Sequence, residues 1–437
     1  MKKTLLSLLL LAAGVIAIAC SSSDKDGKGI INEGTDTIES LIAAETAYPY
    51  LLPDNAENLN DIENARLEGL NDFSFNAIRQ LSVQSGDDWV ASPLSLAYAL
   101  GMLSVGAGDA AAAEIMDALG FGNADRADID NVLLKLTSIL VNKYNDANVG
   151  LANAAIVKKG IELKKSFKEY LKGYYDANVV GLDFSNLKLL LEYINDWAKR
   201  KTEGMIDKVL DEDEISPDVI LYLMNALYFK ADWALPFVAD FTVSSPFYNS
   251  MGNSVAAVQM MNQCSTFDYA ETSSYQVVSL PLGDGGYEFS VLLPKAGHKT
   301  IEILDALTAE SWRAALQSMG PSLVQLSIPQ FDTNNTIDCK EPLKKLGIKT
   351  AFLPGSLTEI AKIPCYLSFC KQIARLKINE KGLEAAAVTI MGVAENAGPS
   401  EVQPIEFRAD HPFLYILSEK STGAILFAGK FSAGKPE

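Results

Sequence analysis

The sequence predicts an α+β fold in which helices and strands are segregated along the chain. Helix-forming patterns dominate the first half and strand-forming patterns dominate the second half. The alternation that would indicate βαβ units is missing, and we find no internal repeat. With 437 residues the chain exceeds the usual size of a single core, so length alone predicts two domains. The pattern nevertheless runs from about residue 71 to the end without a linker.

The helices are predicted from boundary residues and from spacing. Ser92 and Pro93 open the most apolar one, with serine as N-cap and proline at the first helical position. Nearly every side chain from 96 to 105 is small or apolar, so we expect this helix to be buried. A second helix covers 110–119 and ends at Gly120. Helical spacing also recurs over residues 163–175 and 187–200.

The strands are predicted from apolar runs and from alternation. Residues 219–229 form an almost unbroken apolar run, which indicates a central buried strand. Asn225 within it must find hydrogen-bond partners. Residues 283–286 have the composition of a hairpin turn. Residues 373–379 alternate, with Leu376 and Ile378 on one side. The other expected strands are 151–157, 276–282, 287–293, 324–331, 413–417 and 425–431.

The N-terminus has the pattern of a processing segment. Lys2 and Lys3 precede an apolar run, residues 5–19, that is short for a membrane span. Small residues directly before Cys20 resemble a bacterial lipoprotein signal, which predicts removal of residues 1–19 and lipidation of Cys20. An ordinary secretory signal with an incidental cysteine is the alternative. Either pattern predicts export, and a lipid would anchor the protein without a spanning helix.

The segment after the signal resembles a tether. Residues 21–29 are polar and glycine-containing, and residues 30–67 receive no assignment. We therefore divide the chain into a signal at 1–19, a tether and unassigned segment at 20–69, and a folded region at 70–437.

Charge and cysteine content exclude some classes of partner. A net charge of −18 is unfavourable for nucleic-acid binding, so no nucleic-acid partner is expected. The other four cysteines fit no disulfide-rich scaffold, and buried free thiols are favoured. A bridge between Cys365 and Cys370 stays open, because a turn between them would allow one.

The sequence lacks the groups that common hydrolases need. Only two histidines are present, His298 and His411, and neither is flanked by a nucleophile motif. Zinc-protease, phosphate-binding and dinucleotide-binding motifs are absent. We therefore expect no enzyme activity, no cofactor and no metal, although paired carboxylates would leave no sequence signature.

One segment could lie either inside or outside a sheet. Residues 385–394 carry no charge and no proline, and small or β-branched side chains dominate. The segment follows Gly382 and precedes a stretch rich in Gly, Pro and Ser. A chain that can adopt both arrangements can store free energy and release it.

Several motifs, in family order over about residues 71–431, resemble those of the serpin family. Residues 407–417 are similar to its C-terminal signature, with Phe407, Asp410, His411, Pro412 and Phe413. The other matching motifs are Ser92–Ser95, Met102–Ala107, Leu151–Asn153, Tyr174–Ala177, Ile194–Trp197, Thr202–Gly204, Asn225–Lys230, Val258–Met261, Gln276–Val278 and Leu346–Ile348.

The resemblance implies a serpin fold, a single large α+β domain with three β-sheets, about eight or nine helices and an exposed reactive loop at about 380–404. It also implies a mechanism in which a protease cuts the loop, forms an acyl-enzyme and is carried along as the loop inserts into the main sheet. The residues assigned by resemblance to the sheet-opening region are Ser92, Ser95, Asn225, Trp233 and Gln372.

The hinge and the inserting segment resemble those of inhibitory members. Gly382 supplies backbone freedom at the pivot. The side chains expected to face the core are Leu383, Ala385, Ala387 and Thr389, and a charge among them would cost several kcal/mol. The complete set is Glu380, Gly382, Leu383, Glu384, Ala385, Ala386, Ala387, Val388 and Thr389.

Three positions depart from the family pattern. Leu383 replaces a threonine or serine and could slow insertion, which favours cleavage of the loop as a plain substrate. Gln372 replaces a histidine but can still hydrogen-bond to Asn225 or Ser92. Gln330 replaces a lysine that pairs with the hinge glutamate, so we expect the closed hinge to be held less firmly.

Counting from Glu380 in the family register places the scissile bond between Asn396 and Ala397, with Glu395 and Val393 as alternatives. No lysine or arginine lies between residues 384 and 406, so a trypsin-like target is disfavoured. Elastase-like serine proteases and papain-like cysteine proteases suit these side chains, and Asn396 leaves an asparagine-specific protease open.

The sequence thus predicts a monomeric, lipid-anchored endopeptidase inhibitor outside the cytoplasm, periplasmic, surface-exposed or extracellular. Its partners would be a target protease, held covalently, and a membrane through Cys20. A non-inhibitory surface lipoprotein of the same fold, acting as a binding or decoy protein, is the alternative.

Overall fold

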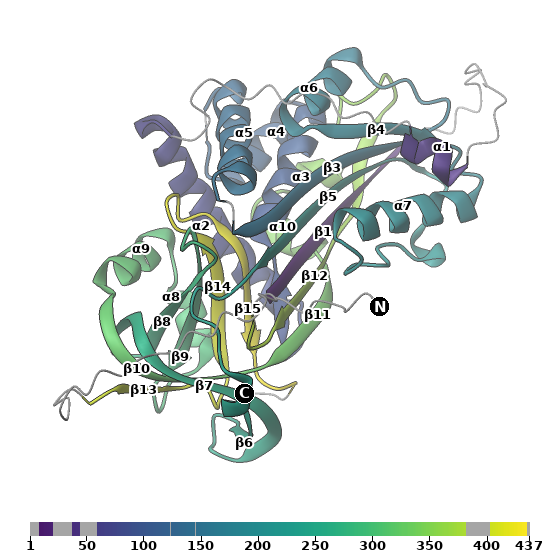
Figure 1. Cartoon of the computed structure of the whole chain (residues 1–437). Helices are drawn as coiled ribbons and strands as arrows, with labels where there is room; N and C mark the ends of the chain where they lie inside the picture. Colours follow the sequence, from purple (N-terminus) through teal and green to yellow (C-terminus); the bar gives the residue numbers. More distant parts are fainter. Residues whose placement is uncertain are drawn as a thin grey trace.

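The computed structural model describes residues 8–20, 37–43, 59–122, 124–144, 146–381 and 403–434. In this part of the chain, helices pack on two β-sheets (Figure 1). The helices are α1 Ile38–Ala43, α2 Asp61–Val83, α3 Pro93–Gly106, α4 Asp109–Ala118, α5 Arg126–Asn142, α6 Lys165–Tyr175, α7 Leu187–Lys201, α8 Thr300–Ala306, α9 Ala309–Ser318 and α10 Lys340–Lys345. Short 3-10 turns cover Glu212–Glu214, Ala239–Phe241 and Thr350–Phe352.

Most of these helices begin where local chemistry predicts. Ser92 caps α3 with its side chain and Pro93 occupies the first turn, as expected. The helices predicted near 110–119, 163–175 and 187–200 are confirmed as α4, α6 and α7. Helix α2 begins at Asp61 with a capping box from Asn60, so it runs across residue 70, where we had begun the folded region. Leu41 of α1 is buried against α7, so part of the segment 30–67, which received no assignment, packs on the body.

The first sheet has six strands in the order β11-β12-β1-β5-β3-β4. The predicted buried strand is confirmed as β5, and the alternating segment 373–379 belongs to β12. The strands are β1 Leu8–Cys20, β3 Ala147–Lys158, β4 Ala177–Leu182, β5 Val219–Ala231, β11 Phe331–Asp338 and β12 Cys365–Ile378.

The second sheet has nine strands in the described part of the chain. It contains the predicted hairpin β8–β9, whose turn uses Gly283 at a φ of 57°. The strands are β2 Trp89–Ala91, β6 Val243–Tyr248, β7 Ser254–Glu271, β8 Tyr275–Leu282, β9 Tyr287–Pro294, β10 Gly320–Pro329, β13 Ile405–Arg408, β14 Phe413–Glu419 and β15 Ile425–Phe431.

The described residues form two sheets and ten α-helices, where three sheets and eight or nine helices were expected. Two of the expected sheets merge because β7 is 18 residues long and belongs to both. Its residues 254–269 pair with β6 and β10, and its residues 268–271 pair with β8. The mixed α+β fold in one domain is confirmed.

The least expected element is β1, which lies at the centre of the six-stranded sheet (purple strand in Figure 1). It contains most of the apolar run that the sequence analysis assigns to a signal. Its neighbours β5 and β12 are both antiparallel to it. We call the space between β5 and β12 the central slot, and β1 fills it.

The six-stranded sheet is covered on both faces. On one face, Leu223 and Leu227 of β5 join the main core, to which α3 contributes almost every side chain. On the other face, Tyr222 and Met224 pack with Trp197 of α7. Because successive side chains of a strand point to opposite faces, a strand in the central slot must be apolar on the side that faces α3 and, on the other side, where it lies beneath α7.

Candidate functional site

The sheet-opening region surrounds the N-terminus of α3, beneath the central slot. Ser92 donates its hydroxyl proton to the Leu426 carbonyl at 2.7 Å and accepts the Ser95 N–H at 3.1 Å. Gln372 of β12 bonds to both backbone groups of Ser92, accepting its N–H at 2.9 Å and donating to its carbonyl at 2.8 Å. One buried glutamine side chain therefore attaches β12 to the start of the central helix. Of the two partners that we had expected for Gln372, the structure shows Ser92.

A second group of hydrogen bonds leads away from the slot through β5. The Asn225 side-chain amide donates to Asn153 Oδ1 at 2.8 Å, and Asn153 in turn donates to the Tyr175 carbonyl at 2.7 Å. Asn225 Oδ1 and the nearby Ser95 hydroxyl are buried and have no hydrogen-bond partner in the protein. A buried oxygen without a partner costs about 1–3 kcal/mol. Two buried oxygens at the floor of the slot therefore lack hydrogen-bond partners.

A buried ion pair supports this region from below, and the sequence analysis did not identify it. Asp130 is fully buried and accepts bonds from Arg126 at 2.9 Å, from Tyr170 at 2.6 Å and from Tyr175 at 2.8 Å. Burial and the neighbouring Asp130 carboxylate raise the pKa of Tyr170 and Tyr175. Arg126 also donates to the Gly101 carbonyl at 2.9 Å, so the cluster ties α5 and α6 to α3.

The hinge lies directly after β12 and is fixed to the loop that follows β5. The Trp233 indole N–H donates to the Asn379 carbonyl at 2.9 Å. The Glu380 carboxylate accepts the Thr242 hydroxyl at 2.7 Å, and its carbonyl accepts the Phe237 N–H at 2.9 Å. Thr242 thus holds the hinge glutamate, a role that in the family pattern belongs to the lysine that Gln330 replaces. Thr242 and Glu380 are 138 residues apart, so no local sequence pattern predicts that they form a hydrogen bond.

Residues 382–402 of the predicted reactive loop lie outside the described residues. This holds for the inserting positions and for the scissile-bond candidates: Gly382, Leu383, Glu384, Ala385, Ala386, Ala387, Val388, Thr389, Val393, Glu395, Asn396 and Ala397.

The signature segment anchors the far end of that loop. Phe407 and Phe413 are buried in the main core. His411 lies 3.1 Å from Asp410 through Nδ1 and 2.9 Å from the Pro294 carbonyl through Nε2. Burial raises the pKa of Asp410, but the bonds from His411 and Arg408 outweigh it and lower the pKa below its usual value. This histidine bonds a carboxylate and a carbonyl, which fits a structural role.

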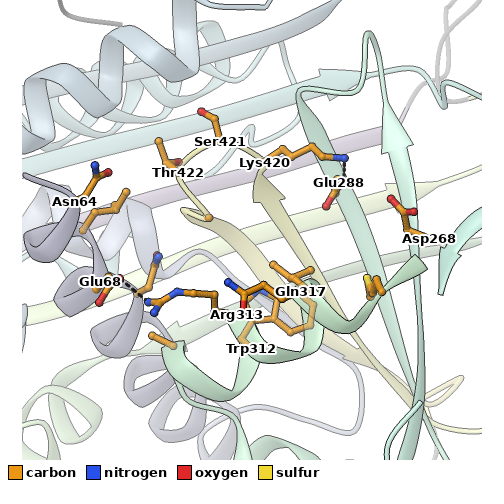
Figure 2. A pocket seen from close by; sticks show the side chains of 16 residues that line it. Asn64, Glu68, Asp268, Glu288, Trp312, Arg313, Gln317, Lys420, Ser421 and Thr422 are labelled. Carbon is orange, nitrogen blue, oxygen red and sulfur yellow. Dashed lines mark ion pairs between the residues drawn. The ribbon is translucent and has the colours of Figure 1, made fainter. Parts of the chain in front are cut away.

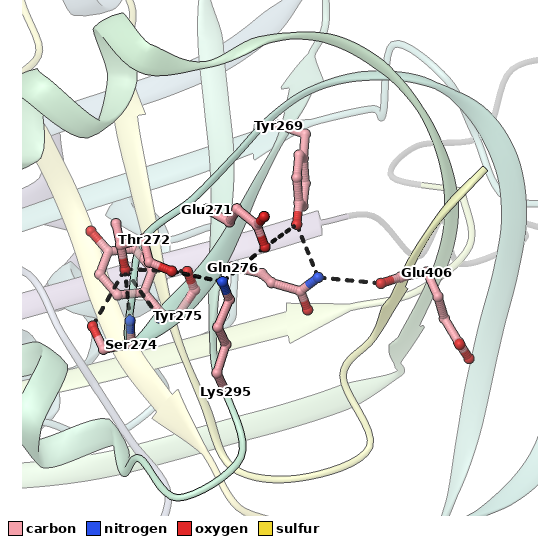
Figure 3. A network of polar contacts seen from close by, with 8 residues as sticks. All are labelled: Tyr269, Glu271, Thr272, Ser274, Tyr275, Gln276, Lys295 and Glu406. Carbon is pink, nitrogen blue, oxygen red and sulfur yellow. Dashed lines mark hydrogen bonds and ion pairs between the residues drawn. The ribbon is translucent and has the colours of Figure 1, made fainter. Parts of the chain in front are cut away.

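Strand β13, which follows the loop, lies at the edge of the nine-stranded sheet. It pairs in parallel with β10 through residues 405–408. Figure 3 shows Gln276 reaching from β8 to the Glu406 carbonyl at 3.4 Å while it also donates to Tyr269 at 2.9 Å. Lys295 pairs with Glu271 at 2.8 Å in the same network. The chain is therefore held on both sides of the loop, at Glu380 by two hydrogen bonds and at β13 by its pairing with β10 and by the buried Phe407.

A cavity of about 460 Å³ lies between α2, α9 and the β14–β15 turn (Figure 2). Its cations are already paired, Arg313 with Glu68 at 2.8 Å and Lys420 with Glu288 at 2.5 Å. Its walls come from segments far apart in the chain, so no local motif predicts it. Its described lining carries no histidine or cysteine.

The described residues offer neither a metal-binding cluster nor a membrane-spanning helix. They contain no group of three or more His, Cys, Asp or Glu side chains able to hold a metal ion. No helix among them is long and apolar enough to cross a bilayer. Among the cysteines of the folded region, Cys264 is exposed and Cys339, Cys365 and Cys370 are buried.

Comparison with known proteins identifies the class to which this arrangement belongs. The family model described as serpin (serine protease inhibitor) matches residues 68–433. Iripin-2 from Ixodes ricinus is 29% identical over 376 residues, covering 84% of this chain and 94% of that protein. Plasminogen activator inhibitor 1 from Sus scrofa is 28% identical over 374 residues, covering 82% and 90%. An uncharacterized serpin-like protein from Methanosarcina acetivorans is 28% identical over 384 residues, covering 86% and 89%.

Solved structures agree with the sequence comparisons. The thermophilic serpin Tengpin in its native state superposes with a TM-score of 0.75 at 25% identity, over 88% of this chain and 97% of that one. Thyroxine-binding globulin in complex with thyroxine gives 0.73 at 26%, over 85% and 99%. The chain belongs to the serpin family. Membership supports protease inhibition as the general activity and a protease as the general class of partner, although some serpins do not inhibit.

Proposed function

We propose that this protein inhibits an endopeptidase by loop insertion. The nucleophile of the protease attacks the Asn396 carbonyl, the Ala397 amine leaves with a proton, and an acyl-enzyme bond joins Asn396 to the protease. The cut loop then enters the central slot and carries the protease with it, so that the active site of the protease is distorted before water cleaves the bond.

The observation that supports this proposal is the geometry of the slot. Strand β12 ends at Ile378, and the hinge follows at once. A segment that turns back there runs antiparallel to β12, which is the direction of β1. Fifteen residues at ~3.3 Å each would span roughly 50 Å. Each new backbone hydrogen bond contributes only about 1 kcal/mol, so the whole strand is needed for a large gain.

The target class follows from the loop sequence. Positions 385–405 contain no lysine or arginine, which disfavours trypsin-like enzymes. Small and apolar side chains around Asn396 suit elastase-like serine proteases and papain-like cysteine proteases. We further propose that lipidation of Cys20 anchors the protein to a bacterial envelope, outside the cytoplasm.

A protease panel tests the inhibitory mechanism. The chain beginning at Ser21 is incubated with elastase-like, papain-like and trypsin-like enzymes, followed by a denaturing gel and thermal melting. We expect an SDS-resistant complex with one of the first two classes. Cleavage at the loop should raise Tm by roughly 10 °C or more, because a full strand is added to the sheet.

A matched pair of loop variants tests the direction of insertion. Ala387→Glu places a charge among the residues expected to face the core, so the complex should be lost while cleavage continues. Ala386→Glu places the same charge on the opposite side and should retain the complex. Equal behaviour of the two variants would contradict insertion in this register.

The alternative function is that of a non-inhibitory binding or decoy protein. Leu383 favours it, because a large residue at the first inward position slows insertion. This alternative predicts clean loop cleavage with no complex and no rise in Tm. A Leu383→Thr variant that gains a complex would identify this one side chain as the cause.

A further inference from the structure

The central slot is already occupied by the N-terminal segment of the chain. Strand β1 pairs with β12 from Leu9 opposite Lys377 to Cys20 opposite Cys365, and with β5 over nearly the same length. Both edges of the slot are therefore paired with it along most of its length. Since β5 and β12 are each antiparallel to β1, they are parallel to one another and could pair directly only if β1 left.

The fit of β1 in the slot is close on both faces. Val15, Ile16, Ala17 and Ile18 are completely buried. Ile16 and Ile18 join the core that contains α3, whereas Val15 and Ala17 join the cluster beneath α7. This alternating assignment is what a strand buried on both faces requires.

The sheet-opening residues also accommodate β1. Gly14 stands directly between Gln372 and Asn225, the two polar residues of the slot. A Cβ at Gly14 would lie 3.6 Å from the Ser95 hydroxyl and 4.0 Å from Ala99, so a small residue fits and a large one does not. Where the register shifts at Ala17, the skipped Ser368 donates its hydroxyl proton to the Ala17 carbonyl at 2.9 Å.

The N-terminal segment and the reactive loop have matching compositions. Residues 11–19 read Leu-Ala-Ala-Gly-Val-Ile-Ala-Ile-Ala, and residues 385–394 read Ala-Ala-Ala-Val-Thr-Ile-Met-Gly-Val-Ala. Neither contains a charge or a proline. Both would enter the slot from the hinge end and run the same way, because β1 begins beside Lys377. Only one of them can be there at a time.

We propose that Leu8–Cys20 is an autoinhibitory strand that occupies the central slot in place of the reactive loop. A chain that retains it is a stable, inactive precursor, and removal or displacement of residues 1–19 prepares the slot for the loop. This inference rests on the proposed inhibitory function for its consequence, but the occupancy of the slot can be tested without any protease.

The first test compares the unprocessed full chain, produced in a cytoplasm, with two variants. Ile16→Asp puts a charge at a fully buried position of β1 but outside residues 68–433, the region matched by the family model. Ser22→Asp adds the same charge two residues beyond β1. We expect the full chain and Ser22→Asp to melt together and Ile16→Asp to melt roughly 10 °C or more lower. Equal melting of all three would overturn the proposal.

Loop cleavage separates this proposal from the proposed function. The full chain should be cut by an elastase-like protease without a complex and without a rise in Tm, whereas cut Ile16→Asp should gain both. A lower Tm for Ile16→Asp with no gain on cleavage would support the autoinhibitory strand and contradict the inhibitory mechanism. A complex formed by the unprocessed full chain would contradict the autoinhibitory strand alone.

A cross-link covers the case in which Ile16→Asp fails to fold. Cys20 and Cys365 are opposite one another in the register, and directly opposed residues of an antiparallel pair lie about 4.5–5.5 Å apart at Cα. That distance permits a disulfide. Mild oxidation of the full chain should therefore give a Cys20–Cys365 peptide by mass spectrometry, absent from Cys365→Ser. Failure to find the peptide in oxidised full chain would contradict the placement of β1.

Discussion

The two sheets of this molecule differ in how their side chains are packed. The nine-stranded sheet is filled with interlocking rings, in which Phe289 stacks on Tyr415 at 5.6 Å and Phe247 meets Phe431 edge to face at 5.3 Å. The six-stranded sheet has at its centre Gly14, two polar side chains and two buried oxygens without partners. Close aromatic packing resists rearrangement, whereas small and polar contacts separate and re-form at lower cost. On our proposal, one sheet is the support against which the other opens.

The largest effect should come from breaking the support. Phe289→Ala removes a fully buried ring that contacts both Tyr415 and Trp233. We expect a loss of about 4 kcal/mol in the free energy of unfolding, measured in urea. The loss should be the same before and after loop cleavage, since this sheet does not change. Phe241→Ala, at a ring 60% exposed, is the control and should change stability by less than about 0.5 kcal/mol.

A smaller effect, but a functional one, should come from the sheet that opens. Gln372→Ala deletes both bonds to Ser92. It leaves the buried Ser92 N–H without a partner and the Ser92 carbonyl with only the Leu96 N–H, which should cost about 2 kcal/mol. The variant should also convert more readily to a form with the uncut loop inserted, visible as lost inhibitory activity on storage. Gln330→Ala serves as the control, because Gln330 bonds to the Gln259 carbonyl through its backbone N–H. Equal loss of activity in both variants would remove Gln372 from the sheet-opening region.

The hinge offers a third test. Thr242→Val removes the hydroxyl that Glu380 accepts while nearly keeping the side-chain volume. We expect a loss of about 1 kcal/mol and faster loop insertion after cleavage, followed by stopped-flow fluorescence of Trp233. An unchanged rate would show that the hinge is held by Trp233 and Phe237 alone.

The smallest effect should depend on pH. Burial raises the pKa of Asp232, beside the top of β5, to about 6, with Lys230 opposing the shift and Asp146 adding to it. Because the folded pKa lies above the unfolded value of 3.8, the folded state prefers the protonated form and loses stability as pH rises through this window. Asp232→Asn should therefore gain about 1 kcal/mol above pH 6, after allowance for solvent screening, and nothing below about pH 4. Urea unfolding at pH 4 and pH 7.5 measures the difference.

The sequence predicts those parts of the fold that depend on residues close together in the chain. The Ser92–Pro93 helix start and the hairpin at Gly283 depend on residues a few positions apart, and both are confirmed. The buried strand β5 is also confirmed, because an apolar run is evident without knowledge of its neighbours.

The parts that sequence reasoning missed depend on partners far along the chain. The bond between Thr242 and Glu380, the cluster around Asp130 and the merging of two sheets through β7 are all of this kind. Strand β1 is the clearest example. An uncharged run after two lysines has the same composition whether it is a signal or a central strand. Only the pairing with β5 and β12, more than 190 residues away, shows that this run can also form a central strand.

Hydrogen exchange at the two strands that border the slot tests the central claim most directly. Amides of β5 and β12 around Asn225 and Gln372 should be protected in the unprocessed full chain, exchange faster in Ile16→Asp, and become protected again once the loop of that variant is cut. Exchange that stays the same through all three states would mean that neither segment enters the sheet.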